Sequence, residues 1–205
     1  DRGQGAFLND RRLRVSGRRN MLDAVFATGI PFAAVPRKAE FTTISYTAQV
    51  QSFKSSWNGS PTVTSSGTLS VVIDGLKNRR LKRLVYEGDG EVQIELFDGK
   101  EISWILPAQK VAYSSDPLAP NYKVWNEGAV YRGTVEGQEA VRALQTDVIK
   151  TPVSTYWIYK GVAIQSELKS DDMVTRTTLL DLVESSTPTA ADFSIPKGYR
   201  RISQR

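Results

Sequence analysis

The side chains that could do chemistry in this sequence are carboxylates, lysines, tyrosines and hydroxyls, because its 205 residues include neither cysteine nor histidine. Without a thiolate or an imidazole, the chain cannot build a His-based catalytic triad, a cysteine nucleophile, a disulfide or a zinc site of the usual kind. Catalysis would have to depend on the remaining side chains or on a bound cofactor. We therefore expect a protein that is not an enzyme and that carries no metal and no other cofactor.

The positive net charge lies at one end of the sequence. Residues 1–38 contain eight Lys and Arg against three Asp, whereas residues 39–205 contain 19 basic and 19 acidic residues. Such a change predicts two parts, a basic appendage of residues 1–38 and a domain of residues 39–205. Because the domain is neutral overall, it has no field that would attract nucleic acid or an anionic membrane.

The appendage carries a weak basic patch. Its arginines are Arg11, Arg12, Arg14, Arg18 and Arg19. Only Phe7 lies near them, so the row of aromatic side chains that stacks bases in single-strand binders is missing. We therefore expect no nucleic-acid partner.

The apolar run at residues 21–35 follows Arg18 and Arg19 and so imitates a signal peptide. Asp23 and Pro31 interrupt the run, which argues against that interpretation. We expect no signal peptide in this stretch. No apolar run in the sequence is long enough to predict a membrane-spanning helix.

From residue 42 onward, apolar and polar residues alternate as they do in half-buried strands. The pattern predicts strands over residues 42–52, 67–74, 92–96, 102–106, 156–159, 162–168 and 174–183. A further, basic strand over residues 79–86 is expected from the second family resemblance given below. Asp98-Gly99 predicts a hairpin with a type I′ turn, and Lys160-Gly161 predicts a second hairpin. Helices are expected only near residues 22–28 and 136–144. The predicted fold class is mainly β (α+β), with about seven to eight strands in a mostly antiparallel meander.

Two runs near the start, RGQGAFLNDRRLRVS from Arg2 to Ser16 and LDAVFATGIPF from Leu22 to Phe32, resemble bacterial inositol monophosphatase family proteins. The residues themselves indicate a hairpin with Asn9-Asp10 at its turn. In that family this stretch is scaffold between the catalytic motifs.

The catalytic motifs of that family are absent from the sequence. They are a Glu-Glu pair, an Asp-Pro-x-Asp-Gly-Thr loop and a Trp-Asp motif, whose carboxylates hold Mg²⁺. The nearest strings are Asp116-Pro117-Leu118, which continues with Ala119-Pro120, and Trp125-Asn126. We interpret both as loop residues. One hypothesis for the whole chain is thus an inactive fragment or fusion of an inositol monophosphatase family protein.

Residues 41–203 resemble the LolA/LolB-like group of periplasmic proteins, which includes outer-membrane lipoprotein-sorting relatives. The resemblance rests on the order of strands and hairpins and on the closing string DFSIPKGY, from Asp192 to Tyr199. It implies a strongly curved antiparallel sheet, an incomplete barrel with few helices around an apolar cavity. It also implies a periplasmic location, an apolar ligand such as a lipid, acyl chain or lipoprotein, and an envelope protein as a further partner.

The favoured hypothesis is a non-enzymatic periplasmic-type module that holds this ligand in the concave face of its sheet. The candidate cavity residues are Ile44, Tyr46, Val50, Leu69, Val71, Ile94, Ile102, Trp104, Trp157 and Leu168. Alternation alone also fits ordinary core residues at each of these positions. A third hypothesis is an interaction domain whose open sheet edge pairs with a partner strand. The ligand's identity and the oligomeric state do not follow from the sequence.

Overall fold

The computed structural model describes residues 7–8, 11–12, 39–56, 59–116, 123–125 and 134–203. The chain divides into two compact units, Asp1–Ala34 and Val35–Arg205. In the first unit, β1 (Phe7–Leu8) pairs antiparallel with β2 (Arg11–Arg12), which is the pairing expected of a hairpin around residues 9–10. The helix expected near residues 22–28 lies outside the described residues.

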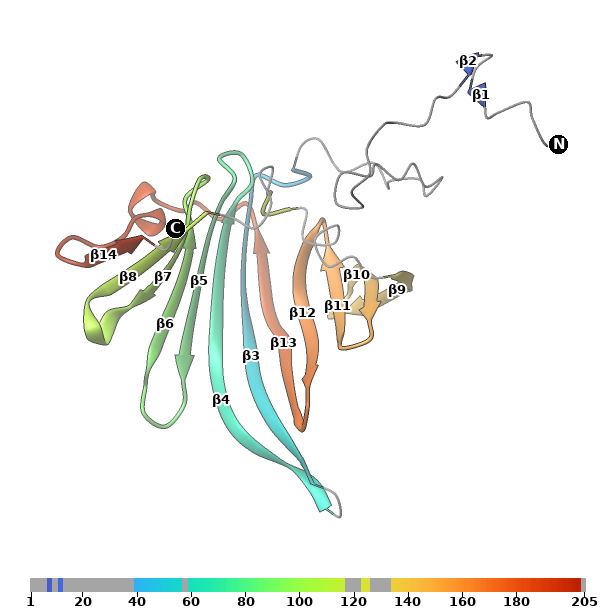
Figure 1. Ribbon diagram of the computed structural model, residues 1–205, viewed down its shortest axis with the longest axis horizontal. Coiled ribbons are helices and arrows are strands. Elements are labelled where there is room, and N and C mark those ends of the chain that lie inside the picture. Colours follow the sequence, from blue (N-terminus) through green and yellow to red (C-terminus); the bar gives the residue numbers. More distant parts are fainter. Residues whose placement is uncertain are drawn as a thin grey trace. The chain divides into compact units, whose positions relative to one another are not determined.

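The second unit is one sheet of twelve strands (Figure 1). The strands in chain order are β3 (Thr43–Ser56), β4 (Gly59–Asp74), β5 (Arg79–Tyr86), β6 (Val92–Phe97), β7 (Ile102–Leu106), β8 (Val111–Ser115), β9 (Thr134–Val141), β10 (Leu144–Thr151), β11 (Ser154–Tyr159), β12 (Val162–Ser170), β13 (Met173–Glu184) and β14 (Arg200–Ser203). Their order across the sheet is β14-β8-β7-β6-β5-β4-β3-β13-β12-β11-β10-β9.

Strands that follow one another along the chain lie side by side, except β8 with β9 and β13 with β14. Two pairings instead join strands that are distant in the chain. β3 pairs with both β4 and β13, which joins the two halves of the sheet. β14 pairs with β8 in parallel, so the sheet is mixed rather than wholly antiparallel. The described helical turns are two short 3₁₀ segments, η2 (Pro107–Gln109) and η3 (Ala190–Phe193). The predicted mainly β class is confirmed, although the sheet has more strands than expected.

Turn residues explain how two of the hairpins form. At the β11–β12 turn, Lys160 (φ 48°) and Gly161 (φ 83°) both have positive φ, as a type I′ turn requires. At the β6–β7 turn, only Gly99 has positive φ, and the Asp98 carboxylate accepts hydrogen bonds from the Lys100 and Glu101 amides at 2.8 and 2.9 Å. The β6–β7 hairpin predicted at Asp98-Gly99 exists. The type I′ turn predicted for it is wrong, because the side chain of Asp98 closes a longer loop.

The helix expected near residues 136–144 is also wrong. Those residues contribute to β9 and the start of β10, which pair from Thr134↔Lys150 to Val141↔Leu144. The neighbouring strand supplies backbone partners that outweigh the local helix preference, and Gly137 (φ 148°) is poorly suited to a helix.

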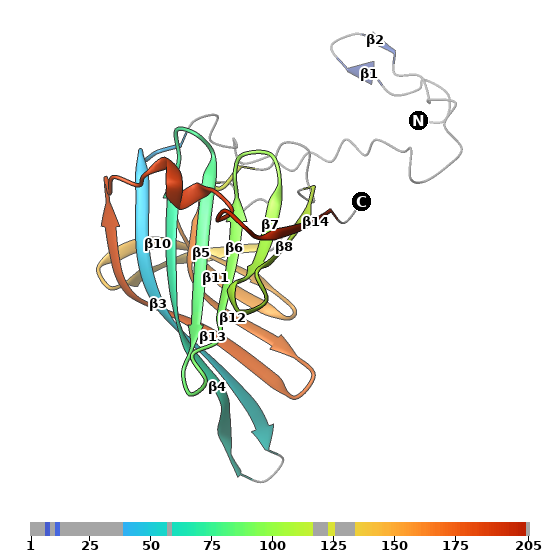
Figure 2. The same ribbon diagram turned by 90° about the vertical axis from the view of Figure 1, so that its left-hand side faces the viewer.

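The sheet is strongly curved, so that β10–β12 pass behind β3–β8 in the side view (Figure 2). We call the inner face of β3–β8 concave and the outer face convex. The side chains of the concave face form a large core with those of β12 and β13, here the concave cluster: Phe41, Ile44, Tyr46, Ala48, Val71, Ile73, Phe97, Val124, Trp125, Val141, Val162, Ile164 and Leu179.

A smaller convex cluster lies on the outer face of β6–β8. Its buried members are Leu96, Ile105, Ala112 and Phe193. Residues 190–199 run over this face (Figure 2), and Ile195 and Tyr199 pack against the cluster beside Phe193. The string DFSIPKGY therefore covers the outside of the sheet. Among the described residues, no helix is long and apolar enough to cross a membrane.

Candidate apolar ligand site

The concave face of β4–β7 is organised in rows that run across the strands, because paired residues of neighbouring strands share a face. One row is apolar apart from its arginine and consists of Ile73, Arg80, Phe97 and Ile102. The next row is Val71, Lys82, Glu95 and Trp104. Beyond it, Leu69, Leu84 and Gln93 continue the face with Leu106.

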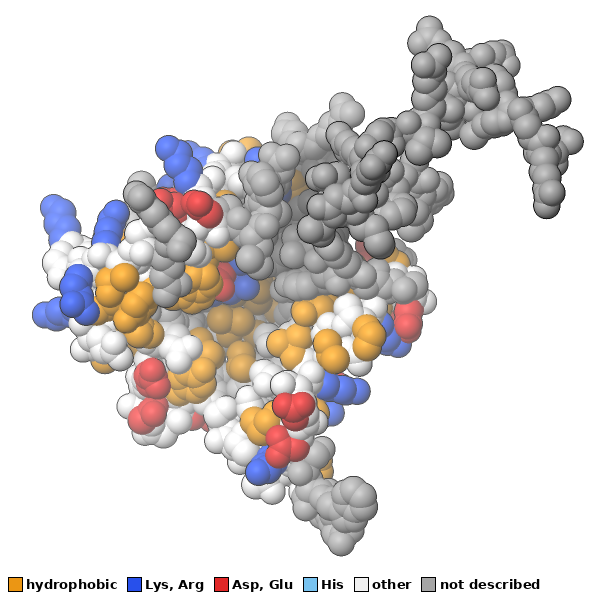
Figure 3. Space-filling view, viewed as in Figure 1, with side chains coloured by type: hydrophobic (Ala, Val, Ile, Leu, Met, Phe, Trp, Pro, Cys, Tyr) orange, Lys and Arg blue, Asp and Glu red, His pale blue; other side chains and the backbone are white. Residues whose placement is uncertain are grey.

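A recess of about 240 Å³ lies over the second and third rows. It is lined by Leu69, Lys82, Leu84, Gln93, Ile94, Glu95, Trp104, Ile105 and Leu106. Hydrophobic side chains line the hollow between the β5–β8 side and the β11–β12 side of the sheet (Figure 3). Ligand pockets for drug-sized molecules usually start at about 300 Å³, so this recess suits a single alkyl chain better than a bulky ligand.

Three charged residues form one wall of the recess and the layer behind it. Arg80 is buried and its Nη2 contacts Glu95 Oε1 at 2.7 Å, while Lys82 Nζ lies 3.8 Å from the same oxygen. Burial raises the pKa of the Glu95 carboxyl, but the positive charges of Lys82 and Arg80 and the hydrogen bond from Arg80 lower it further. The pKa of Glu95 therefore lies below the ordinary value for Glu, and this side chain is a carboxylate near neutral pH.

Residues 123–125 close the concave face at the end where the first row lies. Val124 and Trp125 are buried in the concave cluster. The Val124 amide donates a hydrogen bond to Asn78 Oδ1 at 2.9 Å, which attaches the segment to the β4–β5 turn. On the other side, a Cβ on Gly161 would stand 1.8 Å from the Trp125 carbonyl oxygen. The segment thus lies against the β4–β5 turn and the β11–β12 turn together.

Seven of the sequence-predicted cavity residues lie on the concave face. Ile44, Tyr46 and Val71 are buried in the concave cluster, and Leu69 and Ile102 pack against it. Val50 pairs with Gly67 and Thr177 and is half-buried. Trp104 is 42% exposed and lines the recess. The structure therefore brings Leu69 and Trp104 to the recess and uses most of the others as core.

The remaining three predicted residues lie elsewhere. Ile94 borders the recess, but its side chain packs against the convex cluster. Trp157 packs against the concave cluster and donates its indole N–H to a Glu139 carboxylate oxygen at 2.8 Å. Leu168 is 40% exposed on β12, next to Ser154 and Thr175.

Six further residues that line the recess are not among the sequence-predicted ones: Lys82, Leu84, Gln93, Glu95, Ile105 and Leu106. Leu106 has the same alternation phase as Ile102 and Trp104, so the pattern could have identified it. Lys82 and Glu95 could not be identified that way, because a search for apolar residues passes over polar ones.

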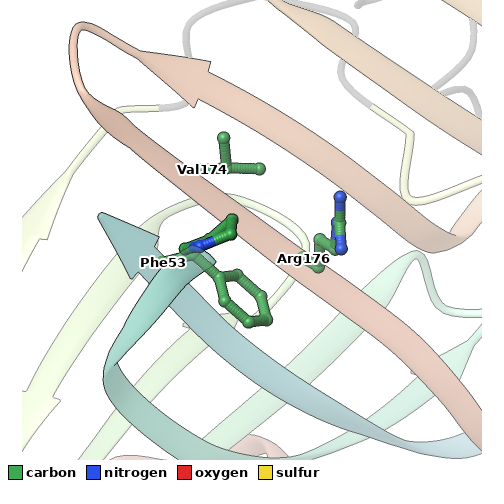
Figure 4. Close-up of a pocket in the computed structure, with 4 residues that line it drawn as sticks. Phe53, Val174 and Arg176 are labelled. Atoms are coloured by element: carbon green, nitrogen blue, oxygen red, sulfur yellow. The ribbon is translucent and has the colours of Figure 1, made fainter. Parts of the chain in front are cut away.

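Two other hollows are less suited to a ligand. One of about 190 Å³ is lined by Phe53, Pro61, Val174 and Arg176 (Figure 4). It lies near the C-terminal end of β3 and the N-terminal end of β13. There the Arg176 guanidinium lies 5.3 Å from the Phe53 ring centroid and is paired with Glu167 at 2.9 Å. The groups that could bind a ligand already bind one another.

The second hollow, of about 370 Å³, is polar and lies where β3, β4 and residues 185–188 meet. Arg79 Nη2 contacts Asp74 Oδ2 at 2.7 Å, and the Thr43 hydroxyl donates a hydrogen bond to the Ser186 carbonyl oxygen. The polar groups of this hollow thus bind one another and hold β3 to residues 185–188 and β4 to β5. Across the described part of the chain, no group of three or more Asp and Glu is placed to hold a metal ion.

Comparison with known proteins gives one short match in sequence. The chain is 48% identical over 42 residues to an inositol-1-monophosphatase from Caulobacter vibrioides, a match that covers 20% of this chain and 16% of that protein. The chain thus spans a small part of the length of this curated relative. No protein-family model matches the sequence.

Solved structures match most of the chain. An uncharacterized conserved protein from Thermus thermophilus aligns with a TM-score of 0.51 and 12% identity, covering 81% of this chain and 93% of that chain. A LolA superfamily protein from Nitrosomonas europaea aligns with a TM-score of 0.35 and 10% identity, covering 73% and 90%. One short stretch of the chain is thus similar in sequence to an inositol-1-monophosphatase, and a LolA superfamily protein is among the similar solved structures.

Proposed function

We propose that residues 39–205 form a non-enzymatic binding domain that holds an apolar chain of a lipid or lipoprotein in the recess over β4–β7. The observation that supports this most is the half-buried surface of Leu69, Leu84 and Leu106, beside the exposed indole of Trp104. A soluble domain gains by burying such a surface, and an alkyl chain would bury it. The resemblance to the LolA/LolB-like group adds a periplasmic location and an envelope protein partner to the proposal.

The size of the recess sets the expected affinity. Burial of about eight methylene groups contributes roughly 6 kcal/mol, at about 0.8 kcal/mol for each. Ordering the chain offsets part of this gain, so we expect a Kd on the order of 0.1 mM.

Titration with a fluorescent fatty acid tests the proposal, with Trp emission as a second signal. Leu84→Asn removes apolar surface from the recess and should weaken binding at least about fivefold, because the alkyl chain then buries less apolar area. Leu168→Asn is the matched control, since Leu168 lies outside the recess, and it should bind as the wild type does. Absence of saturable binding, or equal losses in the two variants, would contradict the proposal.

A further inference from the structure

We propose that the ligand of the recess is a single-chain amphiphile with an anionic head group, and that Lys82 binds this head group. The inference rests on the proposed function, because it names the class of ligand that the recess over β4–β7 accepts. It is carried by the positions of the charged side chains within an otherwise apolar face.

Of the two cations beside Glu95, Lys82 is the one that faces the recess. Glu95 forms its short contact with Arg80, at 2.7 Å, and only a longer one with Lys82, at 3.8 Å. Arg80 lies in the row behind and its side chain is 6% exposed, whereas Lys82 lines the recess and its side chain is 28% exposed. Lys82 is therefore the cation that is placed to meet the head group of a ligand in the recess.

The geometry of the lysine side chain suits this role. An ammonium group is a compact charge with three N–H donors on a flexible stem, so it can turn toward a ligand and still remain near Glu95. Its methylene groups can lie along apolar surface while the charge stays hydrated. Val71 on β4 is its paired neighbour on the same face and supplies such a surface.

The apolar residues provide a path for the chain of the ligand. Leu84 is two residues beyond Lys82 on β5, on the same face, and Leu69 pairs with Leu84 from β4. Leu106 on β7 lines the far side. Four adjacent strands span roughly 14 Å from the first to the last, so a chain across them would contact each leucine. An anionic head group would pair with the charge of Lys82, and the alkyl chain would cover the apolar surface of the leucines.

The test compares probes that share one dodecyl chain: laurate, dodecyl phosphate, dodecanol and dodecyltrimethylammonium, each below its micelle concentration. We expect the two anions to bind about fivefold more tightly than dodecanol at low salt, and the cation to bind least. Added salt should weaken the anions and leave dodecanol unchanged. The ratio of laurate to dodecyl phosphate distinguishes a carboxylate source from a phosphate source.

Variants of Lys82 assign the effect to this residue. Lys82→Met should lower the affinity for laurate to that for dodecanol and leave the affinity for dodecanol unchanged. Lys82→Arg should keep the preference for laurate over dodecanol. Lys100→Met removes the same charge from the β6–β7 loop and should behave as the wild type. Equal binding of laurate and dodecanol by the wild type, or an unchanged preference in Lys82→Met, would overturn the inference and leave the proposed function standing. Failure of all four probes to bind would overturn the proposed function itself.

Discussion

The two faces of β5–β7 both carry apolar side chains, but the chain covers them differently. On the convex face, Leu96 and Ile105 are buried with Phe193 from the segment of residues 190–199. On the concave face, Leu84 and Leu106 remain half-buried beside the recess. The chain therefore covers the outer face of these strands and leaves part of their inner face accessible.

The largest effect should come from the covered face. Phe193 is 5% exposed, and the Arg79 guanidinium lies 4.4 Å from its ring centroid. Phe193→Ala should lower the free energy of unfolding by about 3–4 kcal/mol, because it leaves a cavity in the convex cluster. Trp104→Ala, on the open face, should lower it by less than about 1 kcal/mol.

Urea denaturation followed by circular dichroism measures both variants. Similar losses in the two would mean that the concave face near Trp104 is as well packed as the convex one. The comparison between the faces would then fail.

The closed end of the concave face provides the second test. At Gly161, φ is +83° and a Cβ would meet the Trp125 carbonyl oxygen. Gly161→Ala should therefore lower the free energy of unfolding by about 3 kcal/mol. Gly88 also has positive φ, at +99°, but no atom lies within 4 Å of the position that its Cβ would take. Gly88→Ala should therefore cost only about 1 kcal/mol, which is the backbone contribution.

Thermal or urea unfolding of the two alanine variants isolates the close approach of the Trp125 backbone. If Gly161→Ala lowered the free energy of unfolding by no more than Gly88→Ala does, residues 123–125 would not close this end of the concave face.

Acid should weaken each face through one carboxylate: Asp74, which is buried, and Glu95, which is half-buried. Burial raises the pKa of Asp74, but hydrogen bonds from Arg79 and the Lys77 amide, with their charges, lower it further. The pKa of Glu95 on the concave face is lowered as well. A carboxyl whose pKa is lower in the folded state stabilises the protein above its unfolded pKa, and this contribution is lost as the pH falls through the folded pKa.

The free energy of unfolding should therefore decrease through the protonation of Asp74 as the pH falls below the ordinary pKa of Asp, about 4. In Asp74→Asn, which lacks the titrating group, this part of the pH dependence should disappear. Urea midpoints between pH 6 and pH 3 provide the measurement. An identical pH profile in the wild type and the variant would contradict the assignment to Asp74.

Removal of residues 1–38 should have a smaller effect. Residues 39–205 carry balanced charge, and the twelve-stranded sheet lies within them. We predict that the shortened protein unfolds cooperatively, with a midpoint within a few degrees of the full chain, and binds the fluorescent fatty acid with equal affinity. Aggregation, or tighter binding after the deletion, would show that this segment covers the open face.

The smallest effect is expected from Mg²⁺. The sequence lacks the carboxylate motifs of inositol monophosphatases, so the ion should neither raise the melting temperature nor support release of phosphate from inositol phosphates. Phosphate release that a chelator abolishes would reopen the hypothesis of a catalytic fragment.

Much of the fold follows from alternation and turn residues. The period of two identifies β13 almost to the residue, and Lys160-Gly161 identifies the β11–β12 hairpin. The same pattern does not identify the edge strand β9, because its residues are mostly exposed and its backbone partners on β10 are what make it a strand.

The site is harder to predict because alternation gives two phases and does not say which one faces inward. On β6 the apolar phase, with Ile94 and Leu96, faces the convex side, and the phase with Glu95 and Phe97 faces the concave side. The packing partners on the convex side include Phe193, Ile195 and Tyr199, which lie far along the chain. The inference that an apolar residue points toward the cavity therefore fails at Ile94, where the outer face is covered too.

The order in which the covering residues occur in the chain has a consequence for biosynthesis. Residues 190–199, which cover the convex face of β6–β8, follow those strands only after all of β9–β13. At roughly 5–20 residues per second, a ribosome needs on the order of several seconds to make the intervening chain. During that time Phe193 does not cover Leu96 and Ile105, so the nascent chain exposes apolar side chains and is prone to aggregate. A chaperone that binds apolar strands would protect it at this stage.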